Sequence, residues 1–257
     1  MKFDDVKKLH LKKYRESLGC FLVEGEHLVL ELQKAAQHHP SLRNCELYVT
    51  PEHEHWPGPF AKQVISAQQM AQIAETKSPQ GIIALVPTLP AAAPKLFHRN
   101  DDSAVERAIY LYQVQDPGNL GAILRTLAWF GNFRCLLSPG SVDPYNSKVL
   151  RASMGAIFHV PIEIDVPLET LTRRFARIAC LDTQGEGLQV PSFSTFNCYL
   201  FGNEARGVPR ALLGELKPDY FSIAGFSGAG GRSIESLNLA ASVHMCAYEL
   251  NRKTHNS

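Results

Sequence analysis

The sequence predicts an α/β fold with two domains, in which the larger, C-terminal one contains a parallel sheet. Short apolar segments alternate with amphipathic ones along the chain, and this alternation is typical of strands joined by covering helices. A stretch rich in proline and alanine at residues 87–107 separates two parts of different length. The 257 residues, 45% of them hydrophobic, suffice for one large or two ordinary domains.

The smaller domain is expected to span residues 1–88. Leu28, Leu32 and Ala35 recur at helical spacing and predict an amphipathic helix over residues 26–37. The other expected elements are a polar helix at residues 7–18, strands at 21–23, 45–50 and 80–87, a loop at 51–59, and a strand end followed by a helix within 64–75. Together they form a compact α/β unit of domain size.

The larger domain is expected to span residues 108–257, after a semi-rigid linker at residues 89–107. Its expected strands lie at residues 108–114, 133–138, 157–162, 177–182, 198–202 and 221–223. Its expected helices lie at residues 119–130, within the loop 139–155, at 168–177, near 207, and from 234 nearly to the C-terminus. Apolar strands that alternate with helices predict a parallel sheet covered on both faces.

Local signals set several boundaries in this domain. Residues 116–118, Asp-Pro-Gly, predict a turn, and Asn119 then predicts the N-cap of a helix that Gly131 ends. Residues 185–187 predict a glycine-rich turn. The last helix is preceded by a loop at residues 225–231 with four glycines, and Ser236 and Asn238 are expected in its first turn.

Composition excludes several classes of protein. The net charge of +1 and the pI of about 7.7 give no global sign of a nucleic-acid partner, so only a local basic cluster could provide one. No apolar run is long enough for a membrane span, and the N-terminus lacks the apolar core of a secretory signal. Six scattered cysteines without a CxxC pair are typical of free thiols in a reducing cytoplasm. His53 and His55 flank Glu54 in a proline-rich loop, which we interpret as an exposed loop and not as a metal site.

Polar side chains gather in three loops that follow expected strands. Asn119 and Arg125 follow the strand at 108–114, Glu204 lies in a GNEARG loop after 198–202, and Ser236 and Asn238 follow the glycine loop. Because ligands bind at the carboxyl ends of parallel strands, the three loops are expected to build one site.

Each of these residues also has a purely structural interpretation. Asn119 would cap its helix in any case, Glu204 could cap a helix that starts near Gly207, and Ser236 and Asn238 could simply start a helix. Arg125 lies among apolar residues and needs a carboxylate or phosphate partner, unless it extends along the surface. The chain has no P-loop, and the GAGG at 228–231 comes too late in the chain for a dinucleotide fingerprint, which disfavours a nicotinamide enzyme.

Four segments occur in an order that resembles the SpoU/TrmH family of SPOUT-class RNA methyltransferases. They are QDPGNLGAILRTLAWFG, NSKVLRASMGAIFHVPI, LFGNEARGVP and SIESLNLAASVHMCAYEL. The N-terminal segments FLVEGEHLVLEL and SPQGIIALV are similar to the family's substrate-binding domain, which has a ribosomal-protein-like fold.

The resemblance implies methylation of a ribose 2′-hydroxyl in RNA with S-adenosyl-L-methionine as the donor. Ribosomal RNA is the expected substrate. Transfer RNA is the alternative within the class, and a non-catalytic RNA-binding or ribosome assembly factor is the alternative outside it. The resemblance also implies a deep trefoil knot in the C-terminal domain, a homodimer, a cytoplasmic location, and no membrane or metal partner.

The resemblance further implies three sets of site residues. The expected catalytic residues are Asn119, Arg125, Glu204, Ser236 and Asn238. The expected donor-binding residues are Leu200, Phe201, Gly202, Gly207, Ile223, Leu237 and Asn238. The expected RNA-binding residues are Lys12, Lys13, Arg15, Lys148 and Arg151. The family's loop before the third segment is shorter than residues 225–233 of this chain, so this loop is an extension.

Overall fold

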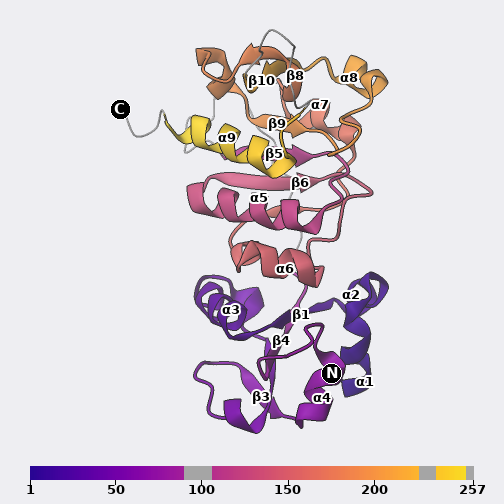
Figure 1. Cartoon of the computed structure of the whole chain (residues 1–257), viewed down its shortest axis with the longest axis vertical. Coiled ribbons are helices and arrows are strands. Elements are labelled where there is room, and N and C mark those ends of the chain that lie inside the picture. The colour runs from indigo at the N-terminus through magenta and orange to yellow at the C-terminus, as the bar shows by residue number, and fades with distance from the viewer. Residues whose placement is uncertain (90–105, 226–235, 253–257) are drawn as a thin grey trace. The chain divides into compact units, whose positions relative to one another are not determined.

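The computed structural model describes residues 1–89, 106–225 and 236–252, and the chain divides into two compact units (Figure 1). The first unit contains residues 1–90 and 143–159, and the second contains residues 91–142 and 160–257. The sequence placed residues 143–159 in the second domain, whereas they pack with the first unit. There Asp143 pairs with Arg15, and the Tyr145 ring lies 4.6 Å from that of Phe21 between centroids.

The first unit is a four-stranded sheet with helices. Its elements are α1 (Phe3–Val6), η1 (Lys7–His10), α2 (Lys12–Leu18), β1 (Cys20–Glu24), α3 (Glu26–His38), η2 (Pro40–Leu42), β2 (Glu46–Val49), η3 (Pro51–His53), β3 (Ala61–Val64), α4 (Ala67–Ile73), β4 (Ile82–Pro87), α6 (Ser147–Ser153) and η4 (Ala156–Phe158). The strand order is β1-β4-β2-β3, and only β2 and β3 pair in parallel.

Residues 7–18 do not form the single helix that the sequence predicts. Leu11 is extended, with φ −98° and ψ 130°, so η1 ends before α2 begins. The break exposes the carbonyl groups of the preceding turn, which need hydrogen-bond donors. Arg15 supplies them, since its Nη1 donates to Leu9 O at 2.8 Å and to His10 O at 2.9 Å.

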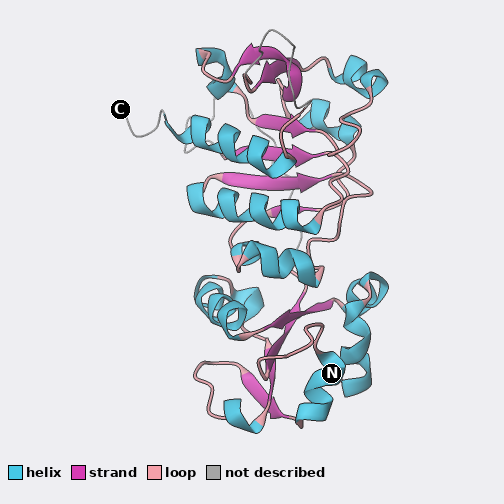
Figure 2. Ribbon diagram, viewed as in Figure 1, coloured by secondary structure: helices cyan, strands magenta, loops and turns pink. Residues whose placement is uncertain are grey.

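The second unit is a six-stranded, all-parallel sheet with helices (Figure 2). Its elements are β5 (Arg107–Leu111), α5 (Pro117–Phe130), β6 (Phe133–Leu137), β7 (Ile162–Glu163), η5 (Leu168–Thr170), α7 (Leu171–Arg174), β8 (Ala179–Gly187), η6 (Pro191–Thr195), β9 (Cys198–Phe201), α8 (Arg210–Leu216), β10 (Asp219–Ser222) and α9 (Leu239–Arg252). The strand order is β10-β8-β9-β5-β6-β7. This arrangement confirms the predicted fold class.

Helices cover this sheet, as the apolar strands require. Ala108, Tyr110 and Leu200 alternate along their strands and pack in one core with the segment of η5 and α7 and with Leu213 of α8. Successive residues of a strand point to opposite faces, so Ile109 and Leu111 are left for the other side. There α5 and α9 run side by side and in contact (Figure 1).

Several predicted boundaries in this unit were wrong. The N-cap of α5 is Asp116, whose side chain accepts from the Asn119 amide at 2.7 Å, so residues 116–118 start the helix instead of forming a turn. Pro117 at the first helical position explains the early start, because its missing N–H needs no partner there. Asn119 is therefore inside the helix and free for another role.

Four other segments differ from the predictions. Residues 157–162, predicted as a strand, hold the end of η4 at Ile157 and Phe158, continue as a turn and irregular chain, and contribute only Ile162 to β7. Residues 185–187 belong to β8, and the helix expected at 168–177 is η5 followed by the short α7. The last helix, expected from Ile234, begins at Leu239 in the described chain, so Ser236 and Asn238 precede it; Ile234 itself lies outside the described residues.

Candidate active site

The strand order of the second unit brings the three predicted loops together. Because β8, β9 and β5 are neighbours and parallel, the segments that follow β9 and β5 leave the sheet at the same edge. A cavity of about 690 Å³ opens there. Its walls are residues 180–183 of β8, the segments after β9 and β10, and the start of α9.

Glu204 holds the loop after β9 against the start of α5. Its carboxylate accepts hydrogen bonds from Gln115 N at 3.2 Å and from Asp116 N at 3.2 Å. The side-chain amide of Asn119 donates to the same carboxylate at 3.2 Å. Glu204 therefore does not cap α8, contrary to one interpretation that the sequence allowed, and it forms no ion pair with Arg125 within the described residues.

Asn119 and Asn238 connect this carboxylate to the last helix. Asn238 Nδ2 donates to Asn119 Oδ1 at 2.9 Å, and Asn238 Oδ1 accepts from Ala241 N at 3.2 Å. Asn238 is thus the N-cap of α9. Because the Glu204 carboxylate can only accept, Asn119 must direct its NH₂ group toward Glu204 and its carbonyl oxygen toward Asn238. Asn238 must in turn direct its NH₂ group toward Asn119, so Glu204 sets the orientation of both side-chain amides.

Arg125 and Ser236 are not drawn into this network. Arg125 lies six residues beyond Asn119 on α5, about 9 Å along the helix axis. It is exposed and forms no hydrogen bond or ion pair with any residue that the structure describes. Ser236 is exposed at the cavity wall, likewise without a hydrogen bond to the described part of the chain.

Gly202 and Asn203 shape the loop after β9. A Cβ on Gly202 would lie 2.6 Å from the Gly207 Cα, so only glycine fits where the loop closes on itself. Asn203 pairs with Gly207 in both directions through the backbone, and it is 7% exposed. Its side chain donates to Gln113 O at 2.7 Å and accepts from Ala205 N at 3.1 Å. No role is predicted for Asn203 from the sequence, although its place beside Glu204 was a usable signal.

The predicted donor-binding residues divide into two groups. Phe201, Gly202, Gly207, Ile223 and Leu237 line the cavity. Leu200 is instead fully buried in the core of the sheet, and Asn238 lies beside Leu237 without being part of the described wall.

The cavity has both apolar and polar walls. Leu213, Leu239 and Met245 form apolar parts, and Asp182, Thr183 and Ser242 supply polar ones, none of which the sequence analysis assigned to a site. Burial raises the pKa of the Cys180 thiol to about 12, so this wall residue is a neutral thiol and not a nucleophile at neutral pH. The cavity is therefore suited to hold an organic molecule of mixed polarity.

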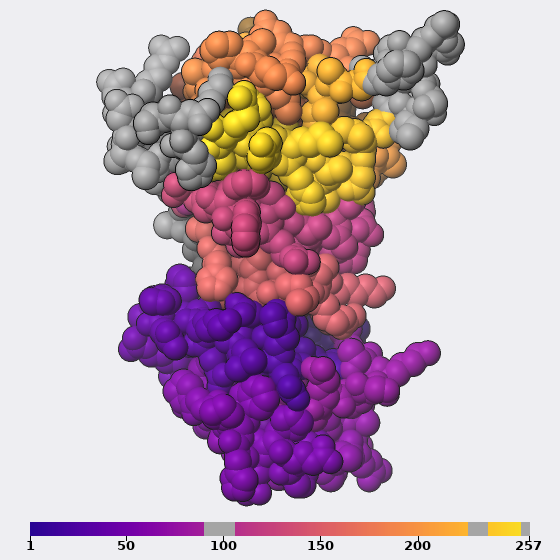
Figure 3. Space-filling view, turned by 60° about the vertical axis from the view of Figure 1, so that its left-hand side comes forward, coloured from indigo at the N-terminus to yellow at the C-terminus, as the bar shows by residue number. Residues whose placement is uncertain are grey.

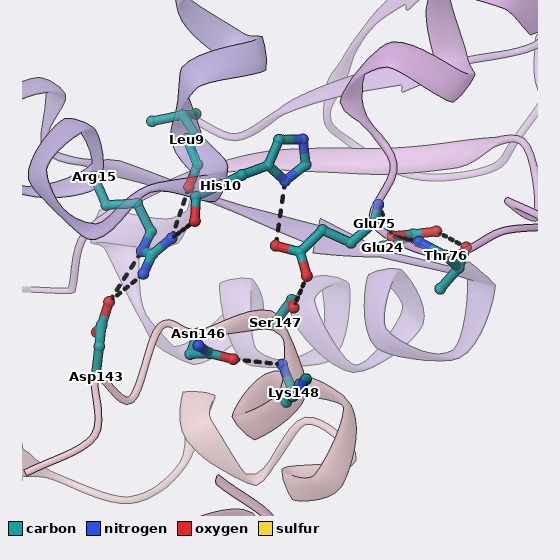
Figure 4. Close-up of polar contacts among 10 residues, drawn as sticks. All are labelled: Leu9, His10, Arg15, Glu24, Glu75, Thr76, Asp143, Asn146, Ser147 and Lys148. Atoms are coloured by element: carbon teal, nitrogen blue, oxygen red, sulfur yellow. Dashed lines mark hydrogen bonds and ion pairs between the residues drawn. The ribbon is translucent and has the colours of Figure 1, made fainter.

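The predicted RNA-binding residues lie in the first unit and differ in availability. Lys12, Lys13 and Lys148 are exposed. Arg15 is 7% exposed and donates from Nε and Nη2 to Asp143 Oδ2 at 3.0 and 2.5 Å (Figure 4), so its guanidinium is not available to a phosphate. Arg151 is half-buried, and it lines a small cavity together with His10 and Glu75.

The described residues contain no group of three or more His, Cys, Asp or Glu placed to hold a metal ion. Among the described helices, none has the length and apolar character needed to cross a membrane.

The all-parallel sheet, with a cavity and a fixed carboxylate–amide network at its strand ends, defines an α/β domain with a site suited to a ligand. Residues 106–248 match the model of the SpoU rRNA Methylase family, which is more than half of the chain, and the chain therefore belongs to this family. Residues 2–84 match the MRM3-like substrate binding domain. The resemblance noted in the sequence is thus confirmed.

Individual relatives agree over the whole length. The 23S rRNA (guanosine(2553)-2′-O)-methyltransferase RlmP of Bacillus subtilis is 29% identical over 261 residues, covering 97% of this chain and 95% of its own. A solved structure from Porphyromonas gingivalis, assigned to the TrmH family of RNA methyltransferases, superposes with a TM-score of 0.78 at 28% identity, covering 98% of this chain and 97% of its own. The SpoU methyltransferase AviRb from Streptomyces viridochromogenes, in complex with AdoMet, has a TM-score of 0.78 at 20% identity over 100% of this chain and 98% of its own, and shows the shared fold alone.

Proposed function

We propose that this protein transfers a methyl group from S-adenosyl-L-methionine (AdoMet) to a ribose 2′-hydroxyl in ribosomal RNA. The observation that carries the proposal is the joining of Asn119, Glu204 and Asn238 beside the cavity, since these residues come from the three segments that resemble the family's motifs. The activity of RlmP, which is similar to this chain over nearly its full length, supports the ribose and the ribosomal substrate.

The cavity suits the donor in size and in chemistry. Its volume of about 690 Å³ falls in the usual range for small-molecule sites. Phe201, Ile223 and Leu237 would contact the adenine and the aliphatic parts, and the backbone at Gly202 would approach closely because no side chain intervenes. When bound, AdoMet supplies an electrophilic methyl group.

We assign the activation of the ribose 2′-hydroxyl to Arg125. A ribose hydroxyl is a weak nucleophile until it loses its proton, and Arg125 is permanently cationic and so a poor base. It would instead bind the neighbouring phosphate in a bidentate manner and favour the deprotonated hydroxyl through its charge, and the hydroxyl proton would leave through that phosphate. Its exposed guanidinium, which has no partner in the described part of the chain, is free for such a contact. Ser236 would line the same site.

We further propose that the protein acts as a homodimer through α5 and α9. Trp129 of α5 is 85% exposed, and Met245 and Tyr248 of α9 are 44% and 60% exposed. The two helices lie next to each other, and Figure 3 shows the yellow surface of α9 beside the magenta surface of α5. Large apolar side chains that gather on neighbouring helices are typical of interaction surfaces.

Two other expectations remain proposals. A trefoil knot in the second unit is expected for the family, and residues 226–235, between β10 and α9, lie outside the described residues. A cytoplasmic location is consistent with six free thiols, because such thiols persist in a reducing compartment.

We also propose that the first unit binds the RNA. Lys12, Lys13 and Lys148 are exposed, and Lys13 Nζ lies 4.7 Å from the ring centroid of Tyr14, an aromatic side chain on which a base could stack. Because the net charge of the chain is only +1, binding would depend on such local groups and would weaken with salt.

Transfer of a labelled methyl group from AdoMet to purified RNA tests the function. Ribosomal RNA from cells that lack the protein should accept label, and the modified position should resist alkaline cleavage, because a methylated 2′-oxygen cannot attack its phosphate. Label in transfer RNA alone would show that transfer RNA, and not ribosomal RNA, is the substrate. Label on a base, with the ribose unmodified, would contradict the proposed ribose methylation.

A further inference from the structure

The charge of the cavity wall is unbalanced. Asp182 and Glu204 lie in the wall, and no Lys, Arg or His belongs to the part of it that the structure describes. A ligand with a positive charge would therefore meet two carboxylates, and no cationic side chain, in the described part of this wall.

Among the residues that the structure describes, no buried cation neutralises either carboxylate. The partners of Glu204 are neutral N–H groups, including those of Asp116 and Asn119. These hydrogen bonds fix the carboxylate and leave its negative charge in place. Asp182 faces Arg210 at 3.4 Å, but the Arg210 side chain is 71% exposed and the ion pair is weak in water.

An irregularity in the sheet places Asp182 in the wall. Cys180 of β8 pairs with Tyr220 of β10, and the next residue of β10, Phe221, pairs with Glu186. Residues 181–185 are therefore not paired in the ladder with β10 and bulge from it. Bulges of this kind redirect side chains near ligand sites, and Asp182 and Thr183 of this bulge line the cavity.

We infer that Asp182 and Glu204 make the cavity selective for AdoMet over its demethylated product, S-adenosyl-L-homocysteine. The inference rests on the proposed function. The two molecules share the adenosine and the amino acid, whose charges cancel at neutral pH. They differ at sulfur, which is a positive sulfonium in the donor and a neutral thioether in the product. Two nearby carboxylates attract only the former, so the wall favours entry of the donor and release of the product.

Calorimetric titration of both molecules into the wild-type protein and into the Asp182→Asn and Glu204→Gln variants tests this assignment. Each substitution should lower the affinity for AdoMet by roughly three- to tenfold more than it lowers the affinity for the product. The effect is no larger because partly exposed charges act through a high effective dielectric. In the wild-type protein, raising the salt concentration should lower the affinity for the donor more than the affinity for the product, because salt screens exposed charges. The matched control is Glu215→Gln, which removes a carboxylate from the exposed face of α8, outside the described wall.

The product serves as an internal check. A variant that still binds S-adenosyl-L-homocysteine has kept its cavity, so a variant that has lost its fold is recognised at once. Asp182→Asn is the cleaner of the two, because Asp182 has no part in the network of Asn119 and Asn238. If both molecules bind and their affinity ratio is the same in Asp182→Asn, Glu204→Gln and Glu215→Gln, the inference is overturned while the proposed function stands. If neither molecule binds the wild type, the proposed function itself fails.

Discussion

Asn238 donates a 2.9 Å hydrogen bond to Asn119, which connects the start of α9 to α5. Asn119 donates in turn to Glu204, so hydrogen bonds connect the segments that follow β5, β9 and β10 at one edge of the sheet. The network has only one consistent direction, because a carboxylate cannot donate. It therefore acts as a fixed frame beside the cavity.

A double-mutant cycle should detect this connection. Asn119→Ala and Asn238→Ala should each destabilise the protein, and Asn238→Ala should do so by about 1 kcal/mol through loss of the α9 N-cap alone. The double variant should be destabilised less than the sum, by about 0.5–1 kcal/mol, the usual value of one side-chain hydrogen bond. Urea unfolding of the four proteins measures the coupling. Strict additivity would show that the contact contributes nothing to stability.

Arg125 should be essential for methyl transfer and dispensable for donor binding. Arg125→Ala should lower the rate by about 10²- to 10³-fold, the usual effect of losing one group that stabilises developing charge. Donor affinity should stay within about twofold, since Arg125 forms no part of the described cavity wall. Arg125→Lys should recover only part of the rate, because an ammonium lacks the bidentate geometry.

Arg173→Ala is the matched control, since it removes an exposed arginine from α7. It should keep the wild-type rate. A normal rate in Arg125→Ala would remove Arg125 from the catalytic set, and a parallel loss of donor affinity would reassign it to the cavity.

The basic residues of α2 should separate into two kinds. Lys12→Glu and Lys13→Glu should weaken RNA binding and lower its salt dependence, with little effect on stability, because both side chains are exposed. Arg15→Ala should instead destabilise the first unit by about 3–5 kcal/mol, because it leaves Asp143 and two carbonyl groups without their partner.

Filter binding and urea unfolding on the same preparations distinguish the two effects. Lys34→Glu is the control for charge reversal, since Lys34 is exposed at 66% on α3 of the same unit. Equal losses of RNA affinity in Lys12→Glu and Lys34→Glu would show that the effect is not specific to α2.

The sequence predicts the sheet but not the contacts across it. The apolar strands at β5, β6 and β9 are correctly located because a strand buried on both faces must be apolar throughout. The strand-end rule also brings Asn119, Glu204 and Asn238 to one edge. The bond between Asn119 and Asn238 spans 119 positions and depends on the strand order, which no local pattern encodes.

Buried charge is the other limit of the sequence. Arg15 lies in a run of basic residues, and the local sequence does not show that its side chain is buried while that of Lys12 is exposed. Its burial follows from the break at Leu11 and from the packing of residues 143–159 against the N-terminal elements of the first unit. Asp182 was missed for a similar reason, since the bulge in β8 that turns it toward the cavity depends on the register of β10.

Glu75 should make the first unit sensitive to acid. Burial acts to raise the pKa of this carboxyl, but hydrogen bonds from Ser147 and His10, with the charge of Arg151, lower it overall below its ordinary value of 4.5 (Figure 4). A carboxyl whose pKa is lower in the folded state stabilises that state above its unfolded pKa. This contribution is therefore complete above about pH 4.5 and is lost as the pH falls through the folded pKa.

Glu75→Gln should accordingly be less stable than the wild type at pH 6, and the difference should shrink as the pH falls below about 4.5. Urea unfolding between pH 3 and pH 7 measures the gap, with Glu52→Gln as the control, because Glu52 is exposed and forms no side-chain contact within the described residues. A gap that stays constant over this range would show that Glu75 has the same pKa in both states. Because Ser147 begins α6, the same loss would weaken one of the contacts that hold residues 143–159 to the N-terminal elements.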